Sequence, residues 1–582
     1  MNNPLSKRML AVLLTLAMIA GACGGGSDGD DASTTDDVAD GTGGDDGSGS
    51  DDGGDGGDDG GSTDSSGTDS GGDAADPARF GGTLRVGFEA DPSGLNPTIS
   101  AMAPGAILMS TAIFETLTVW DENDTWQNNL TESWTPNADF TVWEVKLREG
   151  ITFHDGEPFN TDAVLHSLSA QLTDPLIGLA LRPVFNESLP FEKIDEFSFI
   201  INTSEPNAQL PTYFTTQLGF VGSTKWIEEA KLDPALHQLP VGVGPFKIES
   251  RVQDSMTRVV RNDDWWRDEP IYLDAIEFFP LQQESTRYDQ LLSGDFDMAH
   301  ATDADNIFRM RDEPDFLNIE DDDGEEFLIM FNAQKAPFDD IRVRQAATHL
   351  FPRQEYEDFI QRGTTIPANS MFAPGSKWHA AGLDQQVDSP ELAAPLIAAY
   401  CADVPESCTD GKVNIEFQHN GPSISLDNTF TLIKASWDAG FNITLQVIPQ
   451  DVHVNEVAFG LFDAATWRYH GQIDPEVETL FFSCSTITAI SINFARNCNE
   501  ERDALMSQQR GSTDEAERIA LWQEIQADIN DSRHYLWINH TRWIVSGSEN
   551  VRDVCAGTTP DGQTLRCTHN GKWYTPQIWL EQ

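Results

Sequence analysis

The chain has 582 residues and is strongly acidic: 95 aspartate and glutamate residues stand against 36 lysine and arginine residues, for a formal net charge of −59. Because no basic patch or stripe is present, this composition excludes a protein that binds nucleic acid through its phosphates. Only 17 of the acidic residues are the aspartates between Asp28 and Asp76, so the rest of the chain is acidic as well.

The first residues have the three parts of a secretory signal. Lys7 and Arg8 precede an apolar run over 9–20, and small residues then lead to Cys23, which is the order charged, apolar, small. The run is shorter than the about 20 residues that a membrane-spanning helix needs. Small residues before a cysteine resemble the bacterial lipobox. Residues 1–22 are therefore expected to be a lipoprotein signal peptide, with Cys23 lipidated. The alternative is an ordinary signal peptide cut just before that cysteine.

Low-complexity sequence follows the cysteine. Residues 24–78 are almost wholly Gly, Asp, Ser, Thr and Ala and include no aromatic residue. Such a segment buries too little apolar surface to offset the entropy of ordering it, and repulsion between its aspartates extends it. We predict a disordered tether over 23–79. The aspartates lack the alternation and the bidentate glutamate of a calcium loop, which argues against calcium binding.

Six cysteines remain after Cys23. They form couples that are close in sequence: Cys401/Cys408, Cys484/Cys498 and Cys555/Cys567. An even number in an exported protein indicates disulfides, and six cysteines allow 15 connectivities. The short spacings favour pairing within each couple. A zinc site is the rival interpretation, but no couple has the ligand spacing of zinc sites, so no metal or other cofactor is predicted.

The body of the chain begins at Phe80 and is long enough for two or more lobes. It contains no apolar stretch long enough to span a membrane. Alternating apolar residues predict a strand over 84–88, and the sequence Asp-Pro-Ser-Gly at 91–94 predicts a turn. Apolar residues at helical spacing then predict a helix over 106–117.

The next elements are predicted from residues that start or end helices and strands. A hairpin is predicted over 130–148, and the helix that starts near Ala163 is expected to be capped by Asn160 or Thr161. Further along, Pro352 is expected to shorten or kink a helix. The sequence Ser-Thr-Asp-Glu at 512–515 is a capping box that opens a helix.

Seven segments stand in a fixed order along the body: 81–86, 113–117, 241–248, 261–266, 291–299, 331–346 and 499–537. Examples are Val-Gly-Val-Gly-Pro-Phe-Lys-Ile at 241–248 and Pro-Phe-Asp-Asp-Ile-Arg-Val-Arg-Gln-Ala within the sixth. Together they are similar to motifs of the extracytoplasmic solute-binding proteins of family 5, the peptide, nickel and oligosaccharide receptors of ABC importers. The similarity covers essentially all of residues 80–582.

That resemblance implies an α/β fold of two lobes, the periplasmic-binding-protein-like fold (class II, cluster C type), with mixed sheets in each lobe and a hinge. Lobe I is expected at 80–320, with an extra subdomain inserted at about 126–240. Lobe II is expected at 321–537, and 538–582 would return to lobe I.

The resemblance also implies a function. The protein would capture a peptide-like or other medium-sized solute by hinge closure and deliver it to an ABC permease and ATPase complex. It would act as a monomer on the outer face of the bacterial cytoplasmic membrane. One alternative is a sensor or adhesion receptor of the same fold without its own permease. The other is a secreted hydrolase, but the sequence contains neither the G-x-S-x-G nor the H-E-x-x-H motif, so an enzyme is not expected.

The segment 462–475 is similar to the stretch that lines the solute cleft in this family. By register Gly471 stands where peptide-binding members carry an aspartate for the peptide's α-ammonium. A buried ammonium without a partner is costly, which disfavours short peptides. A gap of one residue in the register would make Asp474 the matching carboxylate instead.

The neighbouring side chains suggest other solute contacts. A guanidinium at Arg468 is suited to clamp a carboxylate or phosphate, and Trp467 and Tyr469 are suited to stack on a ring. The alternative is that Arg468 pairs with one of the chain's own acids and that Trp467 is part of the core. The resemblance further places three side chains in loops at the cleft: Met102, Met371 and Phe372.

Overall fold

The computed structural model describes residues 77–92, 94–100, 102–175, 177–321, 324–421, 423–468 and 471–582. The expected signal peptide, Cys23 with its expected lipid, nearly all of the expected tether and Tyr469 lie outside these residues. Among the residues described, no helix combines the length and the apolar character needed to cross a membrane.

Lobe I is built on a mixed seven-stranded sheet in the order β12-β20-β11-β1-β10-β9-β8. Its strands are β1 (Thr83–Phe88), β8 (Phe246–Val252), β9 (Met256–Arg261), β10 (Ala275–Pro280), β11 (Met298–Ala301), β12 (Leu317–Asp321) and β20 (Trp543–Gly547). β1 runs parallel to β10 and β11. Leu84, Val86 and Phe88 are fully buried in one hydrophobic cluster with helix α2 (Pro104–Ile113), which confirms the strand predicted from their alternation.

Smaller elements complete lobe I. They are helices α6 (Glu284–Leu292) and α7 (Ala304–Asp312) and the short strands β21 (Val551–Arg552), β22 (Thr568–His569), β23 (Lys572–Trp573) and β24 (Trp579–Leu580).

Helix α2 ends four residues before its predicted end. Phe114 already has extended backbone, and its N–H donates to the carbonyl of Ser110. The next residue, Glu115, is buried and accepts hydrogen bonds from the indole of Trp265 at 3.4 Å and the hydroxyl of Tyr574 at 3.2 Å. These long-range contacts, which the local apolar pattern does not contain, hold the segment extended.

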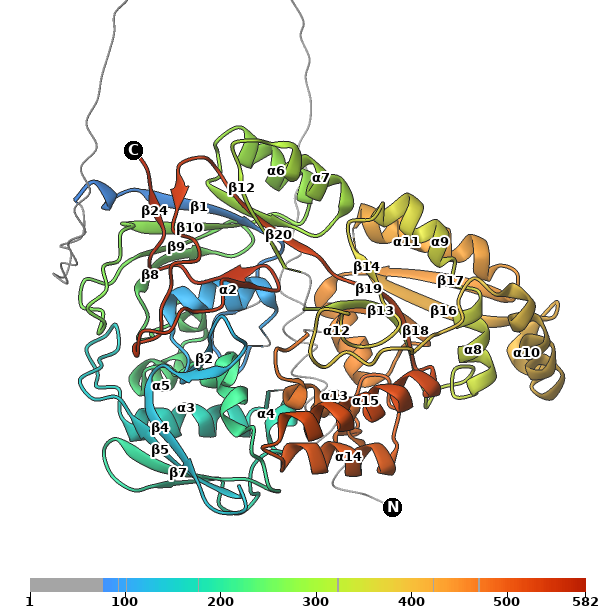
Figure 1. The fold of residues 1–582 in the computed structure, drawn as a ribbon, viewed down its shortest axis with the longest axis horizontal. Coiled ribbons are helices and arrows are strands. Elements are labelled where there is room, and N and C mark those ends of the chain that lie inside the picture. Colours follow the sequence, from blue (N-terminus) through green and yellow to red (C-terminus); the bar gives the residue numbers. More distant parts are fainter. Residues whose placement is uncertain are drawn as a thin grey trace, which may run out of the picture. The chain divides into compact units, whose positions relative to one another are not determined.

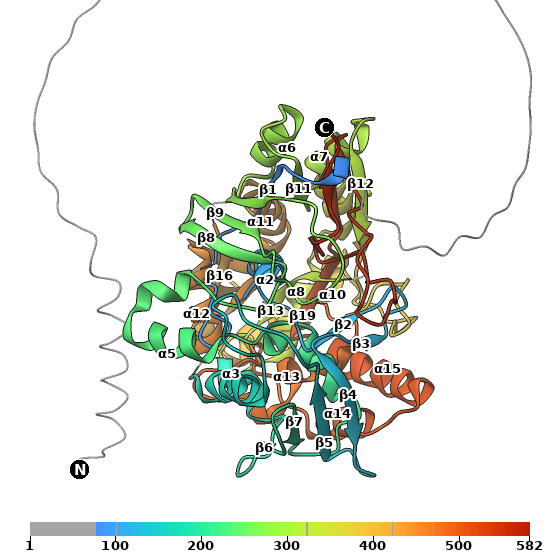
Figure 2. The same ribbon diagram turned by 90° about the vertical axis from the view of Figure 1, so that its left-hand side faces the viewer.

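The inserted subdomain has an antiparallel sheet in the order β4-β5-β7-β6. Its elements are β2 (Thr118–Trp120), β3 (Trp126–Asn128), β4 (Thr131–Pro136), β5 (Val142–Leu147), β6 (Phe191–Lys193), β7 (Ser198–Asn202), α3 (Thr161–Thr173), α4 (Ile177–Leu181), α5 (Thr224–Leu232) and the 3₁₀ turn η2 (Leu210–Thr215). As predicted, Asn160 caps α3, accepting the N–H of Ala163 at 3.1 Å. Figures 1 and 2 show β4, β5 and β7 gathered away from β1, β8 and β9 of the first sheet.

Lobe II carries the second seven-stranded sheet, in the order β14-β19-β13-β18-β16-β15 with β17 also paired to β16. Its strands are β13 (Glu326–Phe331), β14 (Ile366–Pro367), β15 (Cys408–Thr409), β16 (Lys412–Asn420), β17 (Phe441–Ile448), β18 (Ala464–Arg468) and β19 (Tyr535–His540). Ile329 and Phe331 belong to one hydrophobic cluster, and Leu328 and Met330 belong to another. Since side chains alternate along a strand, both faces of this sheet are covered.

The helical elements of lobe II are α8 (Ile341–His349), α9 (Arg353–Tyr356), α10 (Pro390–Asp403), α11 (Ile424–Trp437), α12 (Gln450–Phe459), η7 (Pro475–Glu478), α13 (Thr479–Phe482), α14 (Glu500–Arg510) and α15 (Glu515–Ser532). The break between α8 and α9 falls at Pro352, as predicted. The capping box at 512–515 is wrong by two residues. Asp514 is the cap and accepts the N–H of Glu517 at 3.1 Å, while the hydroxyl of Ser512 donates to the carboxylate of Glu517 at 2.6 Å.

Two short crossings join the sheets. β12 ends at Asp321 and β13 begins at Glu326, while β19 ends at His540 and β20 begins at Trp543. The crossings touch, because the N–H of Thr541 donates to the carbonyl of Glu325 at 2.7 Å. Figure 1 shows β19 in one sheet leading directly to β20 in the other. The chain thus stays in the second sheet up to His540 and enters the first sheet at Trp543.

The six cysteines of the body pair within their couples, Cys401–Cys408, Cys484–Cys498 and Cys555–Cys567. Each disulfide closes a short loop at the end of an element and joins no distant parts of the chain.

Candidate functional site

Arg468 lies where lobe II meets lobe I. It is the last residue of β18, a strand inside the second sheet that pairs with β13 and β16. Its Nη2 lies 3.1 Å from Oε2 of Glu89, and its Nη1 lies 3.5 Å from Oε2 of Glu325. The guanidinium also lies over the ring of Trp543, 5.4 Å from the ring centroid. Glu89 directly follows β1, so this ion pair bridges the two lobes.

Arg468 and its carboxylate partner Glu89 stabilise each other's charged forms. Burial acts to lower the pKa of Arg468, but Glu325 and Glu89 raise it, and it stays above its ordinary value. Burial acts to raise the pKa of Glu89, but the charge of Arg468 lowers it below its ordinary value. Arg468 and Glu89 are therefore an ionised pair, and the hypothesis that Arg468 contacts one of the chain's own acids describes this arrangement.

His300 orients Glu89. Its Nε2 accepts the N–H of Glu89 at 3.1 Å, and its Nδ1 lies 3.1 Å from the carbonyl of Gly571. Since a carbonyl only accepts, Nδ1 carries the proton and the ring is neutral. Burial lowers the pKa of His300 to about 4, in keeping with that state. Lys572, next to Gly571, is a second cation near Glu325. Burial lowers the pKa of Lys572, although the charge of Glu325 acts to raise it. We call Glu89, His300, Glu325, Arg468 and Trp543 the hinge-side cluster.

Trp467 has a different environment from its neighbour. It is half-buried, and its ring lies 5.5 Å from His453 and 5.0 Å from Phe494, measured between centroids. It packs against the hydrophobic cluster of lobe II that also holds Met371 and Phe372. Both of those side chains are buried in that core.

Asp474 forms its contacts with other residues of lobe II. Its two carboxylate oxygens lie 2.7 and 2.6 Å from the guanidinium of Arg518, and one of them caps η7 by accepting the N–H of Glu476 at 2.9 Å. Met102 lies in lobe I, where its N–H donates to the side chain of Gln217 at 3.2 Å. Of the predicted site residues that the structure describes, only Arg468 joins the hinge-side cluster.

Gly471 lies in a space that admits no side chain. A Cβ at this position would be 2.2 Å from the carbonyl oxygen of Gly324, on the crossing between the sheets. The amide of Asn570 donates to the carbonyl of Gly471 at 3.3 Å, so the backbone itself is part of the contact. The side chain of an aspartate would have no room at this place.

A first prediction follows from this contact. Gly471→Ala is expected to destabilise the protein by about 1–3 kcal/mol, because the methyl group forces the backbone of Gly324 to move. Chemical denaturation measures the change. Gly150→Ala is not a suitable control because its positive φ strains any side chain, whereas Gly511→Ala has ordinary contacts and should be far milder. Equal losses in the two variants would contradict the close packing at Gly471.

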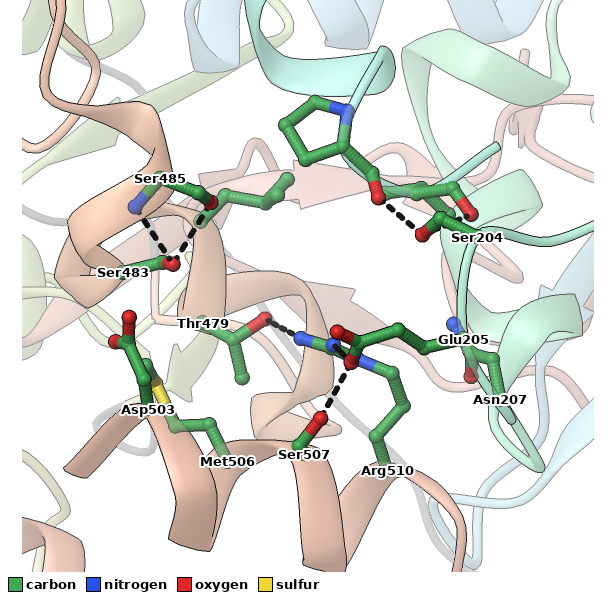
Figure 3. Close-up of a pocket in the computed structure, with 13 residues that line it drawn as sticks. Ser204, Glu205, Asn207, Thr479, Ser483, Ser485, Asp503, Met506, Ser507 and Arg510 are labelled. Carbon is green, nitrogen blue, oxygen red and sulfur yellow. Dashed lines mark hydrogen bonds and ion pairs between the residues drawn. The ribbon is translucent and has the colours of Figure 1, made fainter. Parts of the chain in front are cut away.

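A pocket of about 150 Å³ lies between the inserted subdomain and lobe II, and Figure 3 shows its lining. Its charged groups already have partners. Arg510 pairs with Glu205 at 3.0 Å, and Asp503 accepts the N–H of Cys484 at 3.1 Å. None of its lining residues belongs to the hinge-side cluster. In the described part of the chain, no group of three His, Cys, Asp or Glu residues is arranged to hold a metal ion.

The sequence reasoning missed Glu89, His300 and Glu325. The available signal was the position of Glu89 at the end of β1 and of Glu325 at the start of β13, where loops between lobes begin. Which strand ends meet was not visible from the sequence.

Comparisons with known proteins agree with this architecture. Residues 125–487 match the family described as bacterial extracellular solute-binding proteins, family 5 middle. The chain is 24% identical over 506 residues to di/tripeptide-binding protein 2 of Pseudomonas aeruginosa, covering 82% of this chain and 89% of that protein. It is 23% identical to heme-binding protein A of Haemophilus influenzae, covering 71% and 78%. The solved structure of the periplasmic binding protein DppA of Helicobacter pylori with the peptide STSA is similar, with a TM-score of 0.75, 18% identity and coverage of 87% and 99%.

Proposed function

Because this chain belongs to the bacterial extracellular solute-binding proteins of family 5, we propose that it is a tethered receptor that captures a medium-sized solute between its lobes and delivers it to an ABC importer. The tether would be residues 23–79, held at the outer face of the cytoplasmic membrane by a lipid on Cys23. Its partners would be a permease and ATPase complex, and it would act as a monomer. The described relatives are binding proteins, which agrees with a function without covalent chemistry.

One observation carries this proposal: in the described chain the backbone passes between the two sheets through short segments, after Asp321 and after His540, while an ionised pair bridges the lobes beside them. In a hinge movement, the rotation between two lobes is absorbed by a few residues at crossings of this kind. A solute that contacts both lobes favours the closed state by its differential affinity for that state.

The solute contacts we propose are Trp467, Arg468 and Tyr469. Arg468 retains about a third of its side-chain surface exposed although it pairs with Glu89 and Glu325, which supports its contact with a solute. Asp474, Met371 and Phe372 would support this segment from the lobe II core, and Met102 would do so from lobe I.

The solute we propose is peptide-like, or a compound of similar size that carries an acidic group. A relative is named for di- and tripeptides and a similar structure holds a tetrapeptide. Another relative is named for heme. The close packing of Gly471 leaves no room for the family's carboxylate at that position, which favours a solute held through its anionic end.

A thermal-shift screen of the full-length protein tests this function. The panel would contain dipeptides, tripeptides, longer peptides, heme, a nickel–histidine complex and opine-type amino-acid conjugates. A true solute raises the unfolding midpoint in proportion to the logarithm of its concentration. We expect Arg468→Ala to lose that shift and Lys193→Ala, which removes an exposed cation paired with Asp162, to keep it. A full shift in Arg468→Ala would contradict the role of Arg468, and no shift with any member would contradict the proposed solute class.

A further inference from the structure

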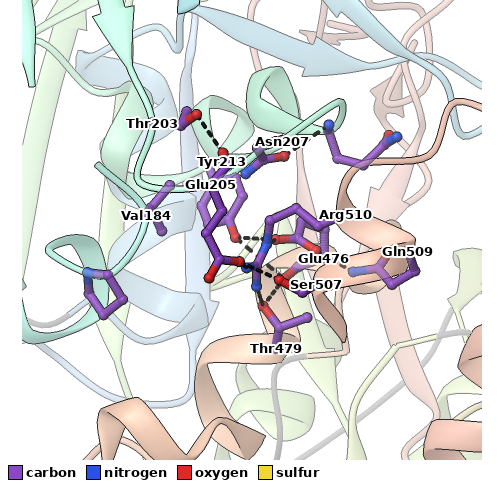
Figure 4. Close-up of polar contacts among 12 residues, drawn as sticks. Val184, Thr203, Glu205, Asn207, Tyr213, Glu476, Thr479, Ser507, Gln509 and Arg510 are labelled. Carbon is purple, nitrogen blue, oxygen red and sulfur yellow. Dashed lines mark hydrogen bonds and ion pairs between the residues drawn. The ribbon is translucent and has the colours of Figure 1, made fainter. Parts of the chain in front are cut away.

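The inserted subdomain and lobe II are held together by polar contacts around Arg510, the last residue of α14 (Figure 4). Its Nη1 lies 3.0 Å from Oε2 of Glu205 in the subdomain. Its backbone carbonyl accepts the N–H of Ala208, also in the subdomain, at 2.8 Å. Close by, the side-chain amide of Gln209 donates to the carbonyl of Ser512 at 3.0 Å. The subdomain therefore contacts the C-terminal end of α14 through both side-chain and backbone groups.

The inner half of this contact is buried and charged. Glu476, with no exposed surface, accepts from Nε of Arg510 at 2.5 Å and from the hydroxyl of Tyr213 at 2.7 Å. The side-chain amide of Gln509 also donates to it. A buried carboxylate needs such donors to offset its desolvation, and one of the three comes from the other side of the interface. We call Glu205, Tyr213, Glu476, Gln509 and Arg510 the latch.

The latch is linked to the segment of the proposed solute contacts. Oε1 of Gln509 accepts from Nη2 of Arg518 at 3.2 Å, and Arg518 makes its two-pronged contact with Asp474. Asp474 in turn caps η7 and lies three residues after Gly471. The polar chain from Glu205 to Asp474 is therefore continuous, and it joins the inserted subdomain to Asp474.

We propose that Arg510 is a positioning residue for solute capture: it holds the inserted subdomain on lobe II and, through Gln509 and Arg518, couples that contact to Asp474. When the subdomain leaves, Glu476 loses the hydroxyl of Tyr213 and its remaining donors rearrange. The meaning of this coupling for transport rests on the proposed function, but its contacts do not depend on the identity of the solute.

The first test measures closure without any solute. The N–H of Ala208 is protected from hydrogen exchange only while it donates across the interface, so its rate reports how often the latch opens. In the full-length protein we expect Glu205→Gln to speed this exchange by about two- to fivefold, the effect of losing one half-exposed ion pair. Glu187→Gln is the matched control, since Glu187 is an exposed acid of the same subdomain with no recorded ion pair among the described residues. An unchanged rate in Glu205→Gln, or an equal rise in the control, would overturn the latch.

The second test measures coupling. The N–H of Glu476 donates to Asp474 within lobe II, so its exchange reports the far end of the polar chain. We expect Tyr213→Phe and Glu205→Gln to speed exchange at Glu476 together with Ala208, while Glu205→Gln leaves the unfolding midpoint unchanged because its side chain is half exposed. Faster exchange at Ala208 without any change at Glu476 would overturn the coupling. A failed solute screen would count against the proposed function and leave both exchange results intact.

Discussion

Arg468→Ala is expected to lower the free energy of unfolding by about 2–4 kcal/mol. The guanidinium lies 3.1 Å from Glu89 and 3.5 Å from Glu325, whose side chain has no exposed surface. Removing one member of a buried pair typically costs about 3–5 kcal/mol, because the remaining charge loses part of its compensation. The partial exposure of Arg468 and the nearby cation of Lys572 reduce that cost. Denaturation in urea at neutral pH measures the loss.

Two further variants separate lost charge pairing from lost packing. Glu89→Gln in the Arg468→Ala background removes one of the stranded charges and should recover part of the stability. Lys193→Ala, which breaks an exposed pair with Asp162 at 2.7 Å, should cost no more than about 1 kcal/mol. If Arg468→Ala costs no more than Lys193→Ala, the bridge between the lobes does not hold them together.

The second large effect is a loss of stability as the pH rises through the neutral range. Glu478, the last residue of η7, is fully buried, and burial raises its pKa to about 8 although the N–H of Gln472, 3.2 Å from Oε1, lowers it. Burial and the charge of Glu478 also raise the pKa of Glu326 well above its ordinary value. A raised pKa in the folded state stabilises the protein fully below the ordinary pKa of glutamate, and that stability is lost as the pH rises toward the folded pKa.

The measurement is the free energy of unfolding between pH 7 and pH 8.5. Buried histidines with lowered pKa values, such as His300 and His453, are neutral in the folded state in this window. Their residual protonation in the unfolded state adds the same slope to the wild type and to the variant, so the comparison between the two cancels it. We expect the wild-type protein to lose stability as the pH rises, and Glu478→Gln to reduce that slope by up to about 1.4 kcal/mol per pH unit. Glu501→Gln, at an exposed acid of α14, should leave the slope unchanged. Identical slopes in the wild type and Glu478→Gln would contradict the burial of Glu478 as a neutral acid.

The sequence predicted helix ends correctly where neighbouring residues alone determine them. Asn160 caps α3 because its side chain reaches the N–H of Ala163 three residues on, and Pro352 ends a helix because proline cannot continue one. The cap of α15 shows the limit of this reasoning. Both Ser512 and Asp514 stand three residues before a glutamate, so the pattern permits two helix starts, and the structure uses the second.

The partners of the site residues could not be predicted from the sequence, because they lie far away along the chain. Arg468 was found through its resemblance to a family segment, but its partner Glu89 lies 379 residues away along the chain. The two meet because β1 and β18, from different sheets, both end at the interface between the lobes. Gly471 is similar: its sequence position showed that a carboxylate was missing, and only its contact with Gly324 explains why none fits.

Hydrogen exchange at the lobe interface, with and without a saturating solute from the screen, tests most directly that this protein captures solute by closing its hinge. The two reporter amides are Ala208, which donates to Arg510 across the interface, and Thr541, which donates to Glu325 between the crossings. We predict that the solute slows exchange at both and leaves strands inside each sheet unchanged. A solute that raises the unfolding midpoint yet leaves both amides exchanging at their original rates would show binding without closure and contradict the account.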